Sequence, residues 1–384
     1  MYDRNYWLAF SAFPGVGPVR FALLLSHFGS AKKAWEATTA DLLKINFGEA
    51  LTSKFDKFRH EFAVDGYASK LKDLAVGTLL LTDEKYPKLL KQIPDPPFVL
   101  YVKGKKIHPR GVATQHPGGG RVDSPGVDSW DISKSIAVVG TRKITSYGRE
   151  VTRFLTQQLV DAGLTIVSGL AMGVDAAAHE AAIEAGGKTI AVLGCGVDCC
   201  NPPVNQWLYD KIVDGNGAIV SEMPLSHFAL KGLFPARNRI ISGLSLGVLV
   251  TEGAEDSGAL ITARNAGEQG RDAFAVPGPI TSSLSKGPTE LIKKGAKLVS
   301  TVEDILDELK ISKIKYQISK REAGTPEEEK IIQIIENEPI EFDEIVRIIA
   351  WPAGKVGSLL SIMEIKGMVK NMGNNMYSIS GLDR

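Results

Sequence analysis

The chain has 384 residues, of which 44% are hydrophobic, and its formal net charge is +1. This length predicts two or three domains with a sizeable core, and the near-zero charge restricts any nucleic-acid surface to a local patch. No run of about 18 apolar residues occurs, which argues against a membrane span and a membrane partner.

The N-terminus and the cysteines indicate the compartment. The first ten residues, MYDRNYWLAF, lack the basic start and long apolar core of a secretion signal. The three cysteines, Cys195, Cys199 and Cys200, lie close together without a fourth cysteine or a nearby histidine. They do not complete a structural zinc site, so we interpret them as reduced thiols. We therefore predict a cytoplasmic protein without a metal.

Residues 1–75 are predicted to form a small helical domain of the helix-hairpin-helix or SAM-like kind. The run FPGVGP (13–18) separates two helical patterns. It resembles a helix-hairpin-helix turn, whose backbone N–H groups hold a DNA phosphate. The alternative is an ordinary tight turn, and the sequence leaves both readings open.

Residues 76–310 are predicted to form a second domain. The segment 108–131 is rich in glycine, proline and polar residues and predicts a mobile loop. From residue 135 onward, short apolar runs alternate with helical patterns, which predicts a doubly wound, mostly parallel sheet with helices on both faces. The strand-like runs are 79–82, 98–102, 136–139, 164–167, 189–193, 218–220, 246–251, 273–276 and 297–299.

Residues 311–325 read as a polar linker and residues 326–384 as a third domain. Three helical patterns, at about 326–336, 341–348 and 353–366, precede two strand patterns joined by a turn at 371–375. Three helices and a two-stranded wing describe a winged helix. Its third helix offers only Lys355 and Lys366 as cations, so DNA binding and protein contact both remain open.

A candidate anion site follows the strand at 136–139, in the segment Gly140, Thr141, Arg142 and Lys143. A helix begins just after it, with Ser146 as the expected N-cap, and a helix N-terminus favours anions. Arg142 can close the site as a forked phosphate donor. The dinucleotide and P-loop fingerprints are both absent, so we predict no nucleotide cofactor.

Other strand ends should meet at the same edge of the sheet, where ligands of such sheets bind. Ser168 and Gly169 end the second strand, and Ser257 is the expected N-cap of a helix beginning at Gly258. Asp175 and His179 could act as an acid–base pair. No suitable nucleophile accompanies them, so we interpret them as structural.

The run FPARNRIISG (234–243) is the most specific feature. Its arginines can clamp phosphates, its asparagine can reach a base edge or sugar, and its phenylalanine can stack on a base. The residues assigned to DNA binding in and before it are Lys231, Phe234, Arg237, Asn238 and Arg239. Alternatively, the arginines pair with Glu222 or Glu252.

Five ordered motifs carry a resemblance to a known family: VGTRKIT, SGLAMGVDAAAH, FPARNRIISGLS, TEGAEDSGALITA and GRDAFAVPG. Across residues 135–310 the chain resembles the DprA/Smf family of bacterial DNA-processing proteins. The resemblance implies an extended Rossmann fold that binds single-stranded DNA and hands it to RecA, without enzymatic activity. It implies DNA contacts at Arg142, Lys231, Phe234, Arg237, Asn238 and Arg239.

Two hypotheses of different classes follow. The first is a recombination mediator that binds single-stranded DNA, protects incoming DNA and loads RecA during natural transformation or DNA processing. Such a protein would act as a homodimer through apolar positions such as Leu284, Leu291 and Ile292, on strands coated by single-strand-binding protein. The alternative is a nucleotide-processing hydrolase on a Rossmann-like fold, for which Glu252 is the only candidate acid.

Overall fold

The computed structural model describes these residues: 2–104, 133–230, 232–311, 325–335, 339–365, 368–373 and 375–379. The chain forms two compact units, Met1–Lys313 and Ile314–Arg384. Four features named from the sequence lie outside the described residues: the loop at 108–131, nearly all of the linker at 311–325, Lys231 and Lys366.

Helices make up the start of the first unit. Their bounds are α1 (Tyr2–Ala12), α2 (Pro18–Phe28), α3 (Ala31–Glu36), α4 (Thr39–Lys44), α5 (Glu49–Glu61) and α6 (Val64–Asp73). Aromatic side chains form their core, where the rings of Phe10 and Phe55 stack with centroids 5.2 Å apart. The predicted helices at the start of the chain are therefore observed, within the same compact unit as the sheet.

Local residues determine the conformation of the turn between α1 and α2. Gly15 has a φ of 117°, in the left-handed region that favours glycine. Pro18 begins α2, where its missing N–H removes no intrahelical bond. The Arg20 guanidinium donates to the Gly15 carbonyl oxygen over 2.7 Å and holds the turn in place.

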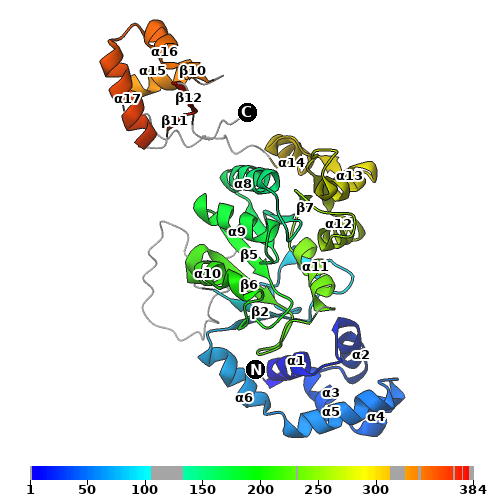
Figure 1. Ribbon diagram of the computed structural model, residues 1–384. Coiled ribbons are helices and arrows are strands. Elements are labelled where there is room, and N and C mark those ends of the chain that lie inside the picture. The colour runs from blue at the N-terminus through cyan, green and yellow to red at the C-terminus, as the bar shows by residue number, and fades with distance from the viewer. Residues whose placement is uncertain are drawn as a thin grey trace. The chain divides into compact units, whose positions relative to one another are not determined.

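A nine-stranded sheet forms the body of the first unit (Figure 1), in the order β1-β2-β6-β5-β4-β3-β7-β8-β9. The strands from β3 to β9 run parallel, and β1 and β2 join the β6 side as antiparallel strands. The predicted doubly wound, mostly parallel sheet is confirmed. The bounds are β1 (Gly77–Leu80), β2 (Val99–Lys103), β3 (Ser135–Val139), β4 (Thr165–Ser168), β5 (Thr189–Val192), β6 (Gly217–Ser221), β7 (Gly247–Val250), β8 (Asp272–Ala275) and β9 (Lys297–Leu298).

The strand order reverses at β3. From β3 the chain builds outward through β4, β5 and β6, and it then crosses to the other side of β3 to form β7. Ligands of open α/β sheets bind beyond the carboxyl ends of the strands at such a reversal. The segments after β3, β4 and β7 are therefore the place to look for a site.

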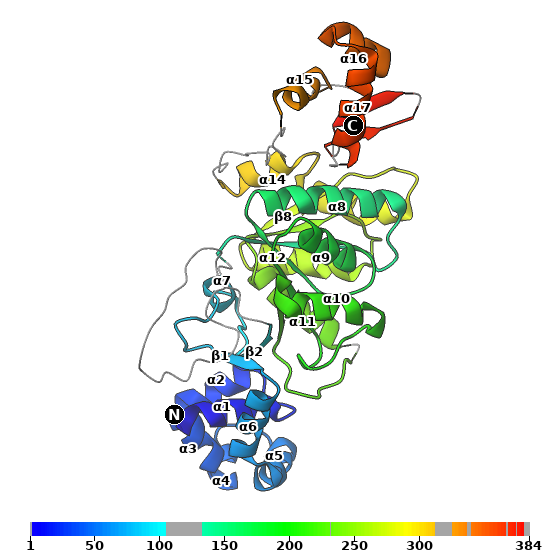
Figure 2. The ribbon, with the colours of Figure 1, turned by 90° about the vertical axis from the view of Figure 1, so that its left-hand side faces the viewer.

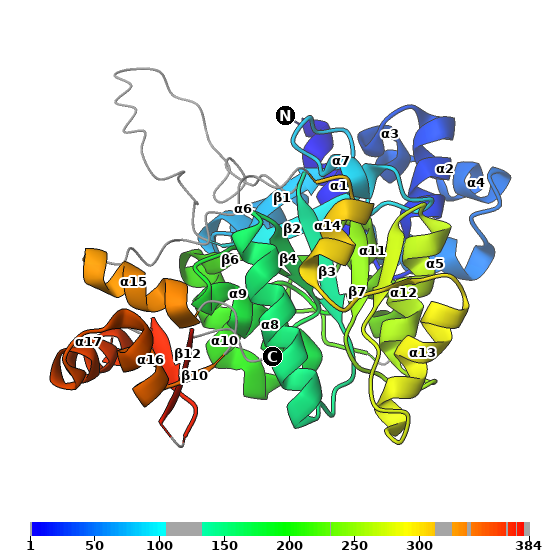
Figure 3. The same ribbon diagram turned by 90° about the horizontal axis from the view of Figure 1, so that it is seen from above.

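Helices cover both faces of the sheet. Their bounds are α7 (Lys88–Lys91), α8 (Ser146–Asp161), α9 (Val174–Glu184), α10 (Gln206–Lys211), α11 (Leu233–Gly243), α12 (Gly258–Glu268), α13 (Lys286–Lys293) and α14 (Val302–Glu308). The α8 and α9 helices pack together on one face, and α11 and α12 pack together on the other (Figure 3). One face of the sheet is therefore covered by α8 and α9. On the other face, α11 and α12 share a core with Ala137, Val139 and Val250.

The N-terminal helices and the sheet share one core. Figure 2 shows these helices next to β1 and β2. The Tyr67 hydroxyl donates to the buried Tyr101 hydroxyl of β2 over 3.2 Å and accepts from the Leu225 backbone N–H over 3.0 Å. Arg4 of α1 pairs with Asp83, just past β1, at 2.8 Å. These contacts fix α1 and α6 against β2, the end of β1 and the segment between β6 and α11.

The second unit is a winged helix, as predicted. Its elements are α15 (Pro326–Ile335), β10 (Ile340–Glu341), α16 (Phe342–Ile349), α17 (Ala353–Ile365), β11 (Val369–Asn371) and β12 (Met376–Ile379). The strands pair in the order β10-β12-β11 around a core that includes Ile331, Ile345 and Leu360. The third strand, β10, was not predicted, because two residues show no alternation.

Membrane-spanning helices were sought in the described part of the chain. No single helix there is long and apolar enough to cross a bilayer, although α16 and α17, bent by 117° at their junction, reach that length and composition as a pair.

Candidate functional site

Glu252 organises the edge of the sheet at the β3–β7 reversal. It follows β7, is only 2% exposed, and its backbone oxygen accepts the Thr141 N–H over 2.7 Å. Its two carboxylate oxygens accept the Thr145 hydroxyl over 2.6 Å and the Thr145 N–H over 3.0 Å. The carboxylate therefore holds the β3–α8 turn in shape and is not presented to a substrate.

Thr145, and not the predicted Ser146, caps α8. The Thr145 side chain accepts the Gly148 N–H over 3.0 Å, and its backbone is extended, whereas Ser146 is already the first helical residue. A residue can hydrogen-bond the helix start in this way only if its own backbone has not yet become helical. The difference moves the predicted helix start by one residue and leaves the anion-friendly helix end beside Arg142.

Close packing explains the glycine that ends β3. A Cβ at Gly140 would lie 2.5 Å from the Glu252 carbonyl oxygen, so only glycine permits this approach of two strand ends. Thr141, the next residue, is 9% exposed and is held by the same carbonyl. Both residues shape the turn, and the two cations that follow them, Arg142 and Lys143, are exposed.

Arg142 and Phe234 come together from segments 92 residues apart. The guanidinium carbon of Arg142 lies 5.2 Å from the centroid of the Phe234 ring, which is a cation–π contact. Arg142 and the adjacent Lys143 are exposed, and Phe234, in the first turn of α11, is half-buried. The turn thus offers solvent two cations and an aromatic ring side by side.

Arg237 lies inside the molecule and differs from the predicted phosphate clamp. It is 6% exposed, and its Nη1 donates to the carbonyl oxygens of Gly169, over 2.8 Å, and Val192. A Cβ at residue 169 would overlap the guanidinium, so this packing also accounts for the glycine. Arg237 ties the ends of β4 and β5 to α11 and has a structural role.

Arg239 follows the alternative reading, in which it pairs with Glu222. Its Nη2 lies 2.6 Å from a Glu222 carboxylate oxygen, and its Nε lies 2.9 Å from Asp95. Asn238 is 8% exposed and donates to the Gly258 carbonyl oxygen over 3.2 Å. Both side chains therefore anchor α11 to its neighbours, and Asn238 places the start of α12 beside that helix.

Backbone N–H groups in the loop after β4 are already hydrogen-bonded within the protein. Ser168 is fully buried and donates to the Val138 carbonyl oxygen over 2.7 Å. The Asp175 carboxylate accepts the N–H groups of Gly169 and Ala171 over 3.1 and 3.4 Å. An internal carboxylate thus occupies the amides that an external phosphate would need, so Ser168 and Gly169 shape the site from below.

His179 has a structural position. It is fully buried, its Nδ1 lies 2.6 Å from the Thr189 hydroxyl, and burial lowers the pKa of its imidazole to about 3. A neutral ring held by a threonine does not shuttle protons near neutral pH. This placement agrees with the interpretation of Asp175 and His179 as structural.

Ser257 caps α12 as predicted. Its hydroxyl accepts the Ala259 N–H over 3.3 Å, and Gly258 at the helix start is exposed. The starts of α8, α11 and α12 are therefore linked at one edge through Thr145 with Glu252, Arg142 with Phe234, and Asn238 with Gly258. The exposed groups at this edge suit a polyanion with stacking bases better than a small, enclosed substrate.

The cysteines offer neither a disulfide nor a reactive thiol. All three are free, and burial raises the pKa of Cys195 to about 12 and that of Cys200 to about 11. Within the described ranges, no group of three or more histidine, cysteine, aspartate or glutamate residues could hold a metal ion.

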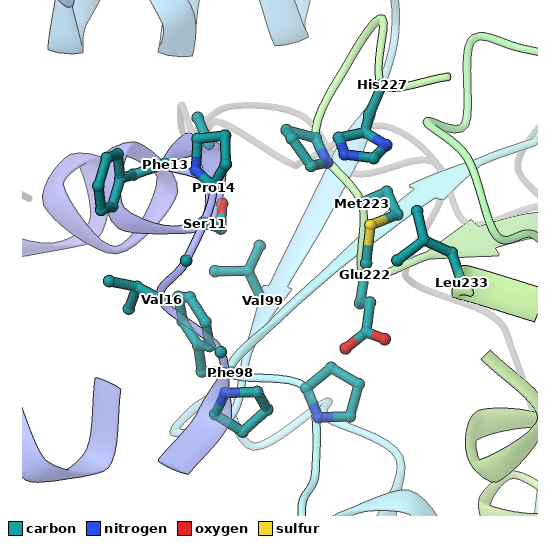
Figure 4. Close-up of a pocket in the computed structure, with 16 residues that line it drawn as sticks. Ser11, Phe13, Pro14, Val16, Phe98, Val99, Glu222, Met223, His227 and Leu233 are labelled. Carbon is teal, nitrogen blue, oxygen red and sulfur yellow. The ribbon is translucent and has the colours of Figure 1, made fainter. Parts of the chain in front are cut away.

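A cavity of about 320 Å³ lies where the N-terminal helices meet the sheet. Figure 4 shows Phe13, Pro14 and Val16 of the α1–α2 turn on one side, and Glu222, Met223 and His227 on the other. This cavity could not be predicted from the sequence, because its two walls are about 200 residues apart and each has its own local explanation as a turn.

Family comparisons agree with the geometry. A family model described as DNA recombination-mediator protein A matches residues 126–310, and a DprA winged helix domain model matches residues 319–375. The chain is 35% identical over 402 residues to Protein Smf of Synechocystis sp., covering 96% of both chains. It is 40% identical over 247 residues to DNA processing protein DprA of Bacillus subtilis, covering 64% of this chain and 75% of that one.

Two solved structures are also similar. The X-ray structure of DNA processing protein A from Streptococcus pneumoniae has a TM-score of 0.64 at 34% identity, covering 79% of this chain and 97% of that chain. A structure of DNA processing protein A from Helicobacter pylori, described by its single-stranded DNA binding mode, has a TM-score of 0.50 at 30% identity. It covers 61% of this chain and 95% of that chain.

Proposed function

Since the chain belongs to the DprA/Smf family of DNA-processing proteins, we propose that it binds single-stranded DNA in the cytoplasm and acts as a recombination mediator. The strand lies along the edge formed by the β3–α8 turn and the starts of α11 and α12. The observation that carries this proposal is the exposed Arg142 guanidinium over the Phe234 ring. The Helicobacter pylori relative, described as binding single-stranded DNA, supports it.

Single strands fit this edge better than a duplex. A cation beside an aromatic ring serves a phosphate and an unpaired base at the same time, whereas bases in a duplex are already stacked on each other. Lys143 and the exposed starts of α8 and α12 add further attraction for phosphates. Lys231 belongs to the same proposed surface by its place in the sequence, just before α11.

The role is non-enzymatic. The hydrolase alternative depended on Glu252, whose carboxylate is engaged by Thr145. His179, in the α9 helix that follows the β4 loop, is buried and neutral. No observation in the described part of the chain favours the hydrolase over the DNA-binding role.

The bound strand is delivered to RecA by a homodimer, on strands coated by single-strand-binding protein. A net charge of +1 leaves most of the surface for protein contacts. The proposed dimer face includes the half-buried Leu284, Leu291 and Ile292, and Ile280 and Leu298 of the same stretch are 100% and 44% exposed. Analytical ultracentrifugation tests this face. The unmodified protein should sediment with the mass of a dimer, and the Ile280→Glu and Leu298→Glu variants should sediment with the mass of a monomer.

Binding of labelled oligonucleotides at two salt concentrations tests the DNA-binding role. Single strands should bind more tightly than duplex, and affinity should fall by roughly 0.7 log units per log unit of salt for each phosphate contacted. Equal affinity for duplex, or no dependence on salt, would contradict the proposal.

The RecA role has its own test. RecA from the same source should hydrolyse ATP faster on coated strands when the protein is present. Unchanged hydrolysis would reject loading and leave DNA binding intact.

A further inference from the structure

The cavity beside the α1–α2 turn has walls that are already fixed. Arg20 holds the turn on one side. On the other side, the Asp198 carboxylate accepts the Ser226 N–H over 2.9 Å, and the Gly196 N–H donates to the His227 carbonyl oxygen over 2.9 Å. The space is therefore pre-formed, as in most ligand sites, and its volume of about 320 Å³ exceeds what one nucleobase needs.

The lining combines flat apolar surfaces with one acid. The cavity is lined by the ring of Phe98, by Val99 and by four prolines, Pro14, Pro18, Pro97 and Pro224. Figure 4 labels Pro14, Phe98 and Val99 among them. Glu222 is the carboxylate in this wall. One of its oxygens accepts from Arg239, and a carboxylate has acceptor capacity for more than one donor. The site suits a flat, aromatic ligand that presents N–H groups.

The cavity and the proposed DNA edge both involve the start of α11. Leu233 lines it and directly precedes Phe234, whose ring carries Arg142. On the outer side, Phe228 follows the lining residue His227 and is 77% exposed, which offers a stacking surface to a neighbouring base. A strand that stacks on Phe234 thus has a base-sized space within reach of its next nucleotides.

We propose that this cavity is a base-reading subsite that takes one unpaired base with an exocyclic amino group, guanine above all, from the bound strand. The inference rests on the proposed binding of single-stranded DNA. Guanine presents N1–H and an amino group side by side, so both donate to the Glu222 carboxylate. Thymine presents carbonyl oxygens on the same edge, which a carboxylate repels.

Competition binding tests the preference with oligonucleotides. The probes are an all-thymine 20-mer and the same strand with one central dG, dC or dA. The strand with dG should bind about tenfold more tightly than the all-thymine strand, because one bidentate base contact gives discrimination of that order. Equal affinity for all four strands would overturn the subsite while the DNA-binding role stands. Failure of every strand to bind would instead reject the DNA-binding role itself.

Gly17→Leu adds a bulky side chain to the lining of the cavity without disturbing its walls. Gly17 lines it, has an extended backbone with φ −94° and ψ −177°, and an added Cβ would meet no atom within 4 Å. The variant should bind all four strands like the all-thymine 20-mer. Gly267→Leu is the matched control, at an exposed position of α12 where an added Cβ also meets nothing, and it should keep the dG preference.

Two results with Gly17→Leu would overturn the inference. Equal weakening of all strands would mean that the cavity does not read bases. Unchanged binding of every strand, with loss of RecA stimulation, would assign the cavity to a protein contact instead.

Discussion

The β3–α8 turn and the start of α11 both carry a pair of cations, yet they use them differently. In the turn, Arg142 and Lys143 are exposed. In α11, Arg237 is bound to backbone carbonyl oxygens and Arg239 to two carboxylates. The first pair is available to a ligand, and the second pair builds the surface on which the ligand would lie.

This difference shows that a basic motif in the sequence does not reveal whether its cations bind a ligand or partners within the protein. Burial of an arginine costs less when its donors find acceptors, and the segments around α11 provide acceptors for both arginines. In these two side chains, only Nε of Arg237 and Nη1 of Arg239 are buried without an acceptor among the described residues. In the β3–α8 turn, Arg142 contacts the ring of Phe234, which comes from α11, and its side chain remains exposed. Mutations should therefore separate the two regions, since one should change stability and the other should change binding.

The largest effect should come from Arg237→Ala. It removes a buried guanidinium that links β4, β5 and α11 and leaves the Asp175 carboxylate without its nearby positive charge. Loss of one partner in such a buried arrangement costs about 3–5 kcal/mol of unfolding free energy. Denaturant unfolding followed by circular dichroism measures it.

Arg264→Ala is the control for Arg237→Ala. This arginine is exposed on α12, so its loss should change stability by no more than about 0.5 kcal/mol. If Arg237→Ala melts like the unmodified protein but no longer binds single strands, Arg237 is a DNA ligand after all and the contrast between the regions fails.

Arg142→Ala should have the opposite profile. Its stability should stay within about 0.5 kcal/mol of the unmodified protein, because the side chain is exposed. Its affinity for single strands should fall by about 1.5–3 kcal/mol, the usual contribution of a charge-assisted hydrogen bond. Fluorescence anisotropy with a labelled strand measures this, and an unchanged affinity would remove the turn from the proposed surface.

Thr145→Ala should act on the shape of the turn. The side chain caps α8 and engages Glu252, and loss of such a cap costs about 1 kcal/mol. Thr145→Ser keeps the hydroxyl and should stay close to the unmodified protein in the same unfolding experiment. Equal stability of the alanine and serine variants would show that the cap does not hold the turn.

Much of the fold could be predicted, because the buried strands of a parallel sheet appear in the sequence as short runs of apolar, β-branched residues. The runs at 136–139 and 218–220 lie within β3 and β6 as observed. Helix starts were harder: Ser146 and Thr145 are equally good caps by residue type, and only the backbone conformation distinguishes them. The two residues of β10 carry no pattern at all.

The location of the candidate site could be predicted from the sequence, but the contacts made by its side chains could not. Strand ends at a topological reversal located it, but the sequence did not say which cations face outward. One signal was present: residues two apart on an α-helix point about 200° apart, so Arg237 and Arg239 could not both face one phosphate. The partners that decide the matter, Gly169, Val192 and Asp95, come from distant segments and needed the structure.

The smallest and most informative change is Arg142→Lys. Lysine keeps the positive charge and can stay over the Phe234 ring, so the attraction of the turn for phosphate as a point charge should persist. It loses the planar fork that binds two phosphate oxygens while the flat guanidinium covers the ring. We therefore expect a loss of binding free energy below about 1 kcal/mol, which is less than for Arg142→Ala, with the salt dependence unchanged because the count of phosphate contacts stays the same.

The measurement is anisotropy at two salt concentrations, with Lys143→Arg as the matched control that adds a fork at the adjacent residue of the turn. If Arg142→Lys binds as weakly as Arg142→Ala, the geometry of the guanidinium over Phe234 matters more than its charge, and the exposed edge would resemble α11 in its dependence on a precise arginine fit.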